Sequence, residues 1–200
     1  LCRLQTDGSK DIGFNLGTSF NGKIYASVIQ TDGKIIVAGA FTTCNGIPVG
    51  RLVRLNADGS RDSSFDTSIA ASTGTIHGLA LQADGKLLVV GSFTKFNGIT
   101  VNRIARVLPN GDLDSSFVTG TGTTSTIDDV AIAPDGKIVL SGSFSSFNGN
   151  TNYSKLVQLH SDGSIDTTFS IGAGFDDAIE AIAVQSDGKI VVGGSFLNYN

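Results

Sequence analysis

The sequence predicts an all-β fold, a β-propeller of four-stranded antiparallel blades with about 52 residues in each repeat. Three observations predict it. Asp-Gly-Lys recurs four times at steps of 52, 51 and 52 residues, and a second set of Gly-containing turns is interleaved with it. No segment shows a helical stripe of apolar residues, and 17 of the 18 acidic residues are Asp, which favours turns. Self-similarity at a period near 50 is typical of propellers, solenoids and arrays.

Each repeat contains four candidate strands, which the copy beginning at Ile76 illustrates. Residues 76–82 alternate weakly, and residues 86–93 form a nearly continuous apolar run beyond the Asp84-Gly85 turn. An Asp-Gly pair between two apolar runs is the strongest short signal of a hairpin. A third segment at 103–108 turns at Asn110-Gly111 into a fourth, which carries Asp-Ser-Ser-Phe at 114–117. The alternative is a right-handed β-solenoid, whose rungs are shorter and whose turns need not be Asp-Gly hairpins.

The chain is expected to be a single repeat domain, residues 1–200. Its units lie at approximately 1–23 (partial), 24–75, 76–126, 127–178 and 179–200 (partial). Leu-Cys-Arg-Leu at 1–4 matches Leu-Val-Arg-Leu at 52–55, so the chain begins on a third strand. We therefore expect a segment of a longer chain and of a larger propeller. The alternative is that the first and last hairpins join into one composite blade and close a four-bladed ring.

Several residues recur in phase and predict how the blades pack. A glycine late in the second strand predicts close approach by a neighbouring blade. Two sets of phenylalanines predict an inter-blade core, and an Asp facing an Arg across the third and fourth strands predicts an ion pair. Asp166 faces Gln158 instead, which predicts that this Asp also caps the following backbone amides. The positions are Gly39, Gly91, Gly142 and Gly194; Phe41, Phe93, Phe144 and Phe196; Phe14, Phe65, Phe117 and Phe169; Asp11, Asp62, Asp114 and Asp166; and Arg3, Arg54 and Arg106.

The two cysteines stand where sister repeats carry apolar residues. Cys2 corresponds to Val53, and Cys44 corresponds to Phe96. This substitution predicts two buried free thiols, with a disulfide as the alternative.

These motifs resemble the delta-60 repeat family, a bacterial β-propeller group of unassigned function. The resemblance is carried by Gln-x-Asp-Gly-Lys at 82–86, Gly-Ser-Phe at 91–93, Phe-Asn-Gly at 96–98 and Asp-Ser-Ser-Phe at 114–117. Four in-phase copies cover essentially the whole chain, although the first departs at Ala40 and Cys44, and the third has an extra residue within 148–154. The resemblance implies extracellular or surface-associated, often very large proteins, and it supplies no catalytic residues.

Composition and motifs exclude several classes of function. The net charge of −4 and the pI near 5.0 argue against a nucleic-acid partner, which usually needs a basic face. No apolar run reaches the roughly 20 residues of a membrane-spanning helix. The sequence contains no nucleophile elbow, Cys-x-x-Cys pair, His-Glu-x-x-His motif or P-loop. We therefore expect no cofactor, no metal site and no catalytic residues.

Candidate binding residues come from the variable parts of the repeats. In an up-and-down blade the constant Asp-Gly turns share one face of the disc, and the variable loops share the other, where binding is usually placed. These loops are residues 42–50, 95–102, 145–154, 67–75, 118–125 and 170–178, with Tyr153 and Phe175 as their exposed aromatic side chains. The residue after the first Ile of the innermost strand is also variable and polar: Tyr25, His77, Asp128 and Glu180. We interpret these four as a ring at the mouth of the central channel, where convergent polar groups would bind a ligand. Alternatively, they are solvated strand ends.

The sequence favours a non-enzymatic structural or adhesive propeller of a surface, secreted, filament or virion-appendage protein. Its expected partners are a protein or a glycan, bound through the variable-loop face, and neighbouring domains or subunits of a larger assembly; membrane insertion is not expected. The alternative is a carbohydrate-active propeller enzyme, or a glycan-binding module of a larger enzyme. An enzyme would need non-repeating acids that converge on the channel, for which the candidates are Asp128, Asp129, Asp176, Asp177 and Glu180.

Overall fold

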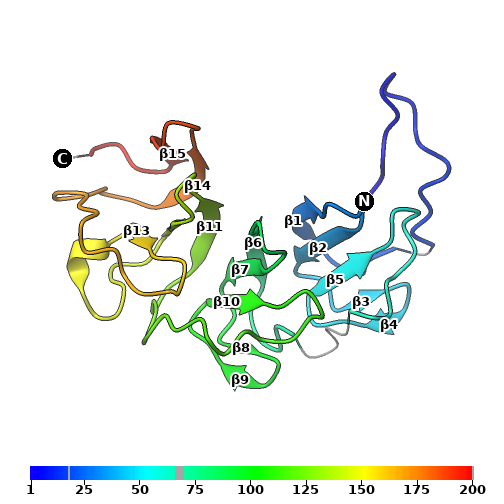
Figure 1. Cartoon of the computed structure of the whole chain (residues 1–200), viewed down its shortest axis with the longest axis horizontal. Coiled ribbons are helices and arrows are strands. Elements are labelled where there is room, and N and C mark those ends of the chain that lie inside the picture. Colours follow the sequence, from blue (N-terminus) through cyan, green and yellow to red (C-terminus); the bar gives the residue numbers. More distant parts are fainter. Residues whose placement is uncertain (18, 66–69, 200) are drawn as a thin grey trace.

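The computed structural model describes residues 1–17, 19–65 and 70–199, and it arranges them as successive antiparallel sheets around an open arc (Figure 1). Three sheets have three strands each, and a fourth has two. Every strand pair is antiparallel, which excludes the β-solenoid and confirms the propeller class. The sheets are β1 (Ile24–Ile29), β2 (Ile35–Gly39) and β5 (Leu52–Leu55); β6 (Ile76–Leu81), β7 (Leu87–Gly91) and β10 (Ile104–Val107); β11 (Ile127–Ile132), β12 (Ile138–Gly142) and β13 (Leu156–Leu159); and β14 (Ile179–Val184) with β15 (Ile190–Gly194).

The prediction of a fourth strand in each blade was wrong, because this segment forms only a single β-bridge with the third strand. Leu55 pairs with Arg61, and the same bridge recurs in the next two blades. The cause lies in the next residue, Asp62, whose Oδ1 accepts a hydrogen bond from the Ser64 amide at 2.9 Å. A side chain that takes up a backbone amide two residues on closes a turn, so the chain curls away from the ladder.

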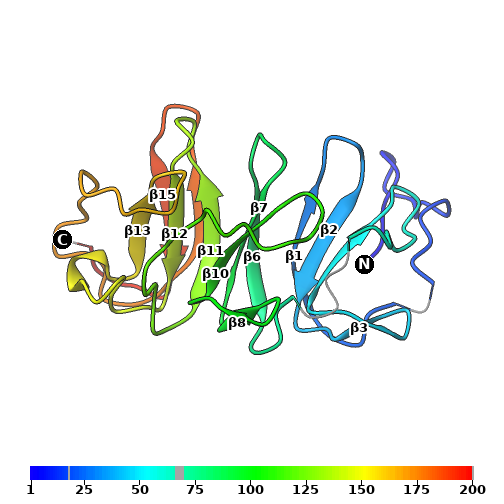
Figure 2. The same ribbon diagram turned by 60° about the horizontal axis from the view of Figure 1, so that its bottom comes forward.

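The two faces of the arc differ as predicted (Figure 2). The Asp-Gly turns project on one face, which we call the constant face. The connections from the second to the third strand lie on the other, the variable face, and two of them are short hairpins where a loop was expected. These are β3 (Thr43–Cys44) with β4 (Ile47–Pro48), and β8 (Lys95–Phe96) with β9 (Ile99–Thr100). In the third blade a 3-10 helix, Thr151–Tyr153, takes their place. Residues 67–69 of the predicted loop at 67–75 lie outside the described residues.

The hydrophobic core lies between neighbouring blades, because the second strand of each three-stranded sheet is buried on both of its faces. One cluster joins Ile36 and Leu52 of the first blade to Leu87 and Phe93 of the second, and similar clusters join the later pairs of blades. The predicted aromatic core is confirmed. Phe14, Phe41, Phe65, Phe93 and Phe144 are buried, while Phe117, Phe169 and Phe196 are half-buried and pack against the same clusters.

The recurrent glycine late in the second strand has a different cause from the predicted one. A Cβ on Gly91 would lie 2.1 Å from the carbonyl oxygen of Thr75, which directly precedes β6 in the same blade. Gly39, Gly142 and Gly194 have equivalent contacts. The close approach is therefore made by the inner strand of the blade itself, not by a neighbouring blade.

The two ends of the described chain do not pair with each other. β15 pairs with β14, and Leu4 forms a bridge with Lys10, so the composite blade considered above is not formed.

Both cysteines are free; Cys44 is buried as predicted, whereas Cys2 is exposed, which was not expected. Val53, the counterpart of Cys2, pairs with Val37 of β2, and the described chain places no such strand beside residues 1–4. In the described residues, no helix is long and apolar enough to span a bilayer.

Candidate functional site

Each of the four inner strands carries a β-bulge at the same place. The pairing register shifts between Ile24 and Ala26 in β1 and between Ile76 and Gly78 in β6, and at the corresponding residues of β11 and β14. A bulge leaves one residue unpaired and re-aims its side chain. The unpaired residues are Tyr25, His77, Asp128 and Glu180, the four predicted site residues. They lie at the end of each inner strand that is opposite the Asp-Gly turn, and so on the variable face.

The structure brings three of these four side chains together across three blades. The rings of Tyr25 and His77 are 5.3 Å apart between centroids, and His77 Nδ1 lies 3.1 Å from Asp128 Oδ1. A carboxylate only accepts hydrogen bonds, so Nδ1 carries a proton. In the neutral ring Nε2 then accepts from the hydroxyl of Thr75, 2.6 Å away. We call Tyr25, His77 and Asp128 the bulge row.

The members of the bulge row differ in exposure. Tyr25 is 50% exposed, whereas the side chains of His77 and Asp128 are 28% and 24% exposed. The row therefore presents one half-exposed aromatic ring, followed by two polar side chains that are about three-quarters buried. Glu180 is exposed and accepts a hydrogen bond from Ser195 Oγ at 2.8 Å, within its own blade. The contacts among the described residues do not join Glu180 to the other three.

Hydroxyl groups surround the bulges, and sequence reasoning did not assign them to the site. Ser92 Oγ lies 3.0 Å from Thr75 Oγ1, and Ser125 Oγ lies 3.1 Å from Ser143 Oγ. Ser92, Ser143 and Ser195 are the serines of the recurrent Gly-Ser-Phe motif. One feature of the sequence could have pointed to these serines. The first copy of the motif carries Ala40 in place of the serine, and it belongs to the same blade as Tyr25.

Three of the acids proposed for an enzymatic site form local or inter-blade contacts instead. Asp129 bridges two blades, because Oδ2 accepts from the Ile182 amide at 2.9 Å and Oδ1 accepts from the Val130 amide. Burial raises the pKa of Asp129, although these bonds oppose the effect. Asp176 caps the backbone near Asn198, and Asp177 accepts from the next amide along the chain. Within the described residues, no three His, Cys, Asp or Glu side chains form a group that could hold a metal.

The expected exposure of two loop aromatic residues was wrong. Tyr153 and Phe175 are half-buried, and each packs against a hydrophobic cluster. Phe175 also contacts the ring of Tyr199 at 4.6 Å between centroids. The exposed tyrosines are Tyr25 and Tyr199, the second of which is 58% exposed.

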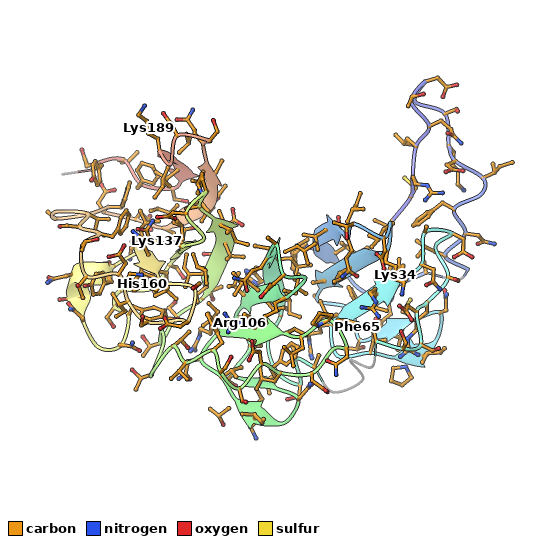
Figure 3. The ribbon with its side chains drawn as sticks, in the orientation of Figure 1. Lys34, Phe65, Arg106, Lys137, His160 and Lys189 are labelled. Atoms are coloured by element: carbon orange, nitrogen blue, oxygen red, sulfur yellow. The ribbon has the colours of Figure 1, made fainter. Side chains whose placement is uncertain are left out.

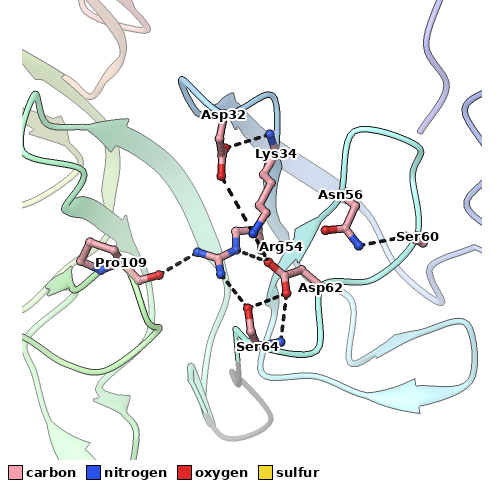
Figure 4. A network of polar contacts seen from close by, with 8 residues as sticks. All are labelled: Asp32, Lys34, Arg54, Asn56, Ser60, Asp62, Ser64 and Pro109. Atoms are coloured by element: carbon pink, nitrogen blue, oxygen red, sulfur yellow. Dashed lines mark hydrogen bonds and ion pairs between the residues drawn. The ribbon is translucent and has the colours of Figure 1, made fainter.

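The constant face contains a repeated ion-pair network, one copy of which is drawn in Figure 4. Figure 3 labels cations from three successive copies, Lys34, Arg106 and Lys137. Arg54 Nε donates to Asp62 Oδ2 at 2.8 Å, which confirms the predicted cross-strand pair, and Lys34 Nζ reaches the same oxygen at 2.9 Å. Burial opposes the ionisation of Asp62, but hydrogen bonds from Ser64 and Lys34 outweigh it and hold the pKa of Asp62 well below its usual value. Asp166 also caps the backbone as predicted, since its Oδ1 accepts from the Thr168 amide at 2.9 Å.

The arginine of this network also joins successive blades, which sequence analysis did not reveal. Arg54 Nη1 donates to the carbonyl oxygen of Pro109, on the turn of the next blade, at 2.7 Å (Figure 4). Arg54 also lies over the ring of Phe65, 4.5 Å from its centroid. Arg3 and Arg106 repeat this arrangement in the neighbouring blades. The constant face is therefore a structural clamp between blades.

Comparison with known proteins agrees with this architecture. The profile of a domain of unknown function, the DUF5122 β-propeller, matches residues 30–65, 82–117, 133–169 and 185–200. The chain belongs to this β-propeller family. The four matches begin near the Asp-Gly turns, so the family unit is the repeat seen in the structure.

Solved structures support the same fold. The WD40 β-propeller domain of Doa1 matches with a TM-score of 0.64 at 18% identity, over 96% of this chain and 53% of that one. A gluconolactonase from Xanthomonas campestris, XC5397, matches with a TM-score of 0.53 at 16% identity, over 96% of this chain and 61% of that one. At these identities the likeness concerns the fold alone, and the chain spans little more than half the length of either structure. No curated protein matches the chain.

Proposed function

We propose that this chain is a non-enzymatic structural or adhesive propeller module that binds a partner through its variable face. The observation that carries the proposal is the division between the two faces. On the constant face, Arg54 and Lys34 both pair with Asp62, and the same contacts recur in the next blade. On the variable face, the side chains at the bulges differ in every blade and include the half-exposed ring of Tyr25. Non-repeating groups held on a rigid repeated scaffold are typical of binding surfaces.

The resemblance to delta-60 repeats supports placing the module on a cell surface, in a secreted protein, or in a filament or virion appendage. The negative net charge agrees with a protein or glycan partner rather than a nucleic acid. Neighbouring domains or subunits of a larger assembly are further candidate partners.

Matched double variants on the two faces test the proposal. Ile99 is 55% exposed at the tip of the β8–β9 hairpin, and Ile29 is 72% exposed beside an Asp-Gly turn. Ile99→Asp with Lys95→Glu changes the variable face, and Ile29→Asp with Lys189→Glu makes the same chemical changes on the constant face. The immobilised chain is screened against a glycan array and an array of extracellular-matrix proteins. We expect binding to fall only in the variable-face variant; equal loss in both variants, or no binding by the wild type, would contradict the proposal.

A carbohydrate-active enzyme is the second candidate, and one observation favours it. Thr75, His77 and Asp128 lie in the order hydroxyl, imidazole and carboxylate that hydrolases use to activate a nucleophile. Against it, Asp129, Asp176 and Asp177 form backbone contacts. Release of reducing ends from polysaccharides that the chain binds would decide in favour of the enzyme, if His77→Ala abolished the release.

A further inference from the structure

We propose that the bulge row is the binding centre of the variable face and that it takes a neutral sugar ring of a glycan. The inference rests on the proposed function and names its ligand. It also depends on the bulges, because regular pairing would turn alternate side chains to opposite faces of the sheet and would give no unpaired position. Three adjacent inner strands, β1, β6 and β11, each supply one bulge residue, and these strands neighbour one another in this order.

Tyr25 supplies the apolar part of the site. Its ring is half-exposed, and its only described ring contact is with His77, at an angle of 47° between the two planes. An aromatic face carries negative charge density, and the polarised C–H groups on one side of a sugar ring pack well against such a face. Tyr25 has two side-chain torsions, so little conformational entropy is lost when a ligand fixes it.

Asp128 supplies the hydrogen-bond acceptors. Its Oδ1 is bound to His77, but a carboxylate has about four acceptor sites, so capacity remains for ligand hydroxyls. The hydrogen bond from His77, whose ring also contacts that of Tyr25, fixes the orientation of the carboxylate. The hydroxyls of Thr75 and Ser92 lie on the other side of His77 and add groups that both donate and accept. His77 thus links an open aromatic face, a fixed carboxylate and several hydroxyls, and this combination matches a ligand that has an apolar face and a rim of hydroxyl groups.

Other classes of ligand fit less well. The bulge row carries one carboxylate, Asp128, and no Lys or Arg, which disfavours an anionic ligand. A metal ion is also disfavoured, because His77 and Asp128 are not joined by a third His, Cys, Asp or Glu in the described part of the chain. An organic ammonium ion is the closest competitor, since carboxylates and aromatic rings attract cations. The experiment below therefore includes choline.

The test uses the whole chain, a panel of neutral oligosaccharides that contain glucose, galactose, mannose or N-acetylglucosamine, and choline. Binding is measured by saturation-transfer NMR and titration calorimetry. The site variants are Tyr25→Ala and Asp128→Asn. Their matched controls are Tyr199→Ala, which removes the other exposed tyrosine, and Asp187→Asn, which neutralises an exposed aspartate of the constant face. Circular dichroism melts confirm that each variant is folded.

We expect the wild type to bind at least one oligosaccharide. Each site variant should lose at least about tenfold in affinity, which corresponds to about 1.4 kcal/mol of binding free energy. Each control should stay within about twofold of the wild-type affinity. Sugar binding that both site variants retain would overturn the bulge row as the site while leaving variable-face binding intact. Binding of a matrix protein but of no oligosaccharide, or a preference for choline, would overturn the glycan and spare the proposed function. If neither the glycan array nor the array of extracellular-matrix proteins yields a ligand, both proposals are wrong.

Discussion

The constant face and the bulge row use similar polar side chains in opposite ways. On the constant face, Asp62 is bound by Arg54, Lys34 and Ser64 and is buried together with Arg54. In the bulge row, Asp128 is bound by His77 alone among the described contacts and remains partly exposed. From this difference we infer that an aspartate saturated with partners serves the scaffold, and we propose that one with free acceptor sites serves recognition. Stability and binding measurements on variants of the two regions test this division.

The largest effect is expected in the inter-blade core. Phe93→Ala should lower the free energy of unfolding by about 3–5 kcal/mol, because Phe93 is fully buried between blades. Thr124→Ala in an exposed loop of the variable face should change it by less than about 0.5 kcal/mol. Urea denaturation of both variants measures the contrast. Equal shifts would show that core and loop are wrongly assigned.

The constant face should be the next most sensitive region. Asp62→Asn should cost about 2–3 kcal/mol, because it removes the charge that compensates the buried guanidinium of Arg54. Asp84→Asn, on an exposed turn where the aspartate is bound by Lys86, is the matched control and should cost less than about 1 kcal/mol. The comparison of the two denaturation midpoints checks the prediction, which fails if the exposed position is equally sensitive.

The same aspartates should make stability depend on pH in the acid range. The folded pKa of Asp62, Asp114 and Asp166 lies below the unfolded value of about 3.9, so the unfolded chain binds more protons between the two values. Their stabilisation is therefore complete above about pH 4 and is lost as the pH falls through the folded pKa. Asp62→Asn should flatten the curve of unfolding free energy against pH below pH 4. A curve parallel to that of the wild type would contradict the assignment.

The smallest effect on stability is expected in the bulge row. Tyr25→Ala should change the free energy of unfolding by less than about 1 kcal/mol, because half of the side chain is already in solvent. A thermal melt beside the sugar titration checks it. A large loss of stability would place Tyr25 with the scaffold and would remove the distinction between the two regions.

The sequence was sufficient to predict the propeller, the inner strands and the inter-blade phenylalanines, because Asp-Gly turns and apolar runs are local signals. It was not sufficient to predict the loss of the fourth strand, since the Asp58-Gly59 turn after Leu55 is typical of a hairpin, whereas the Asp62 side chain takes a backbone amide and ends the pairing. The positions of Tyr25, His77 and Asp128 were predicted from their variability alone. That they are bulge residues depends on register, which only the pairing of two strands reveals.

The contact from Arg54 to Pro109 has a consequence for how such chains evolve. The acceptor is a backbone carbonyl, and its equivalents in the other blades belong to Ala57 and Ser161. Because every residue has a carbonyl, the joint between two blades does not depend on the side chain at that point. A change of residue at this carbonyl therefore leaves the contact between two blades intact, just as the bulge residue can change from blade to blade.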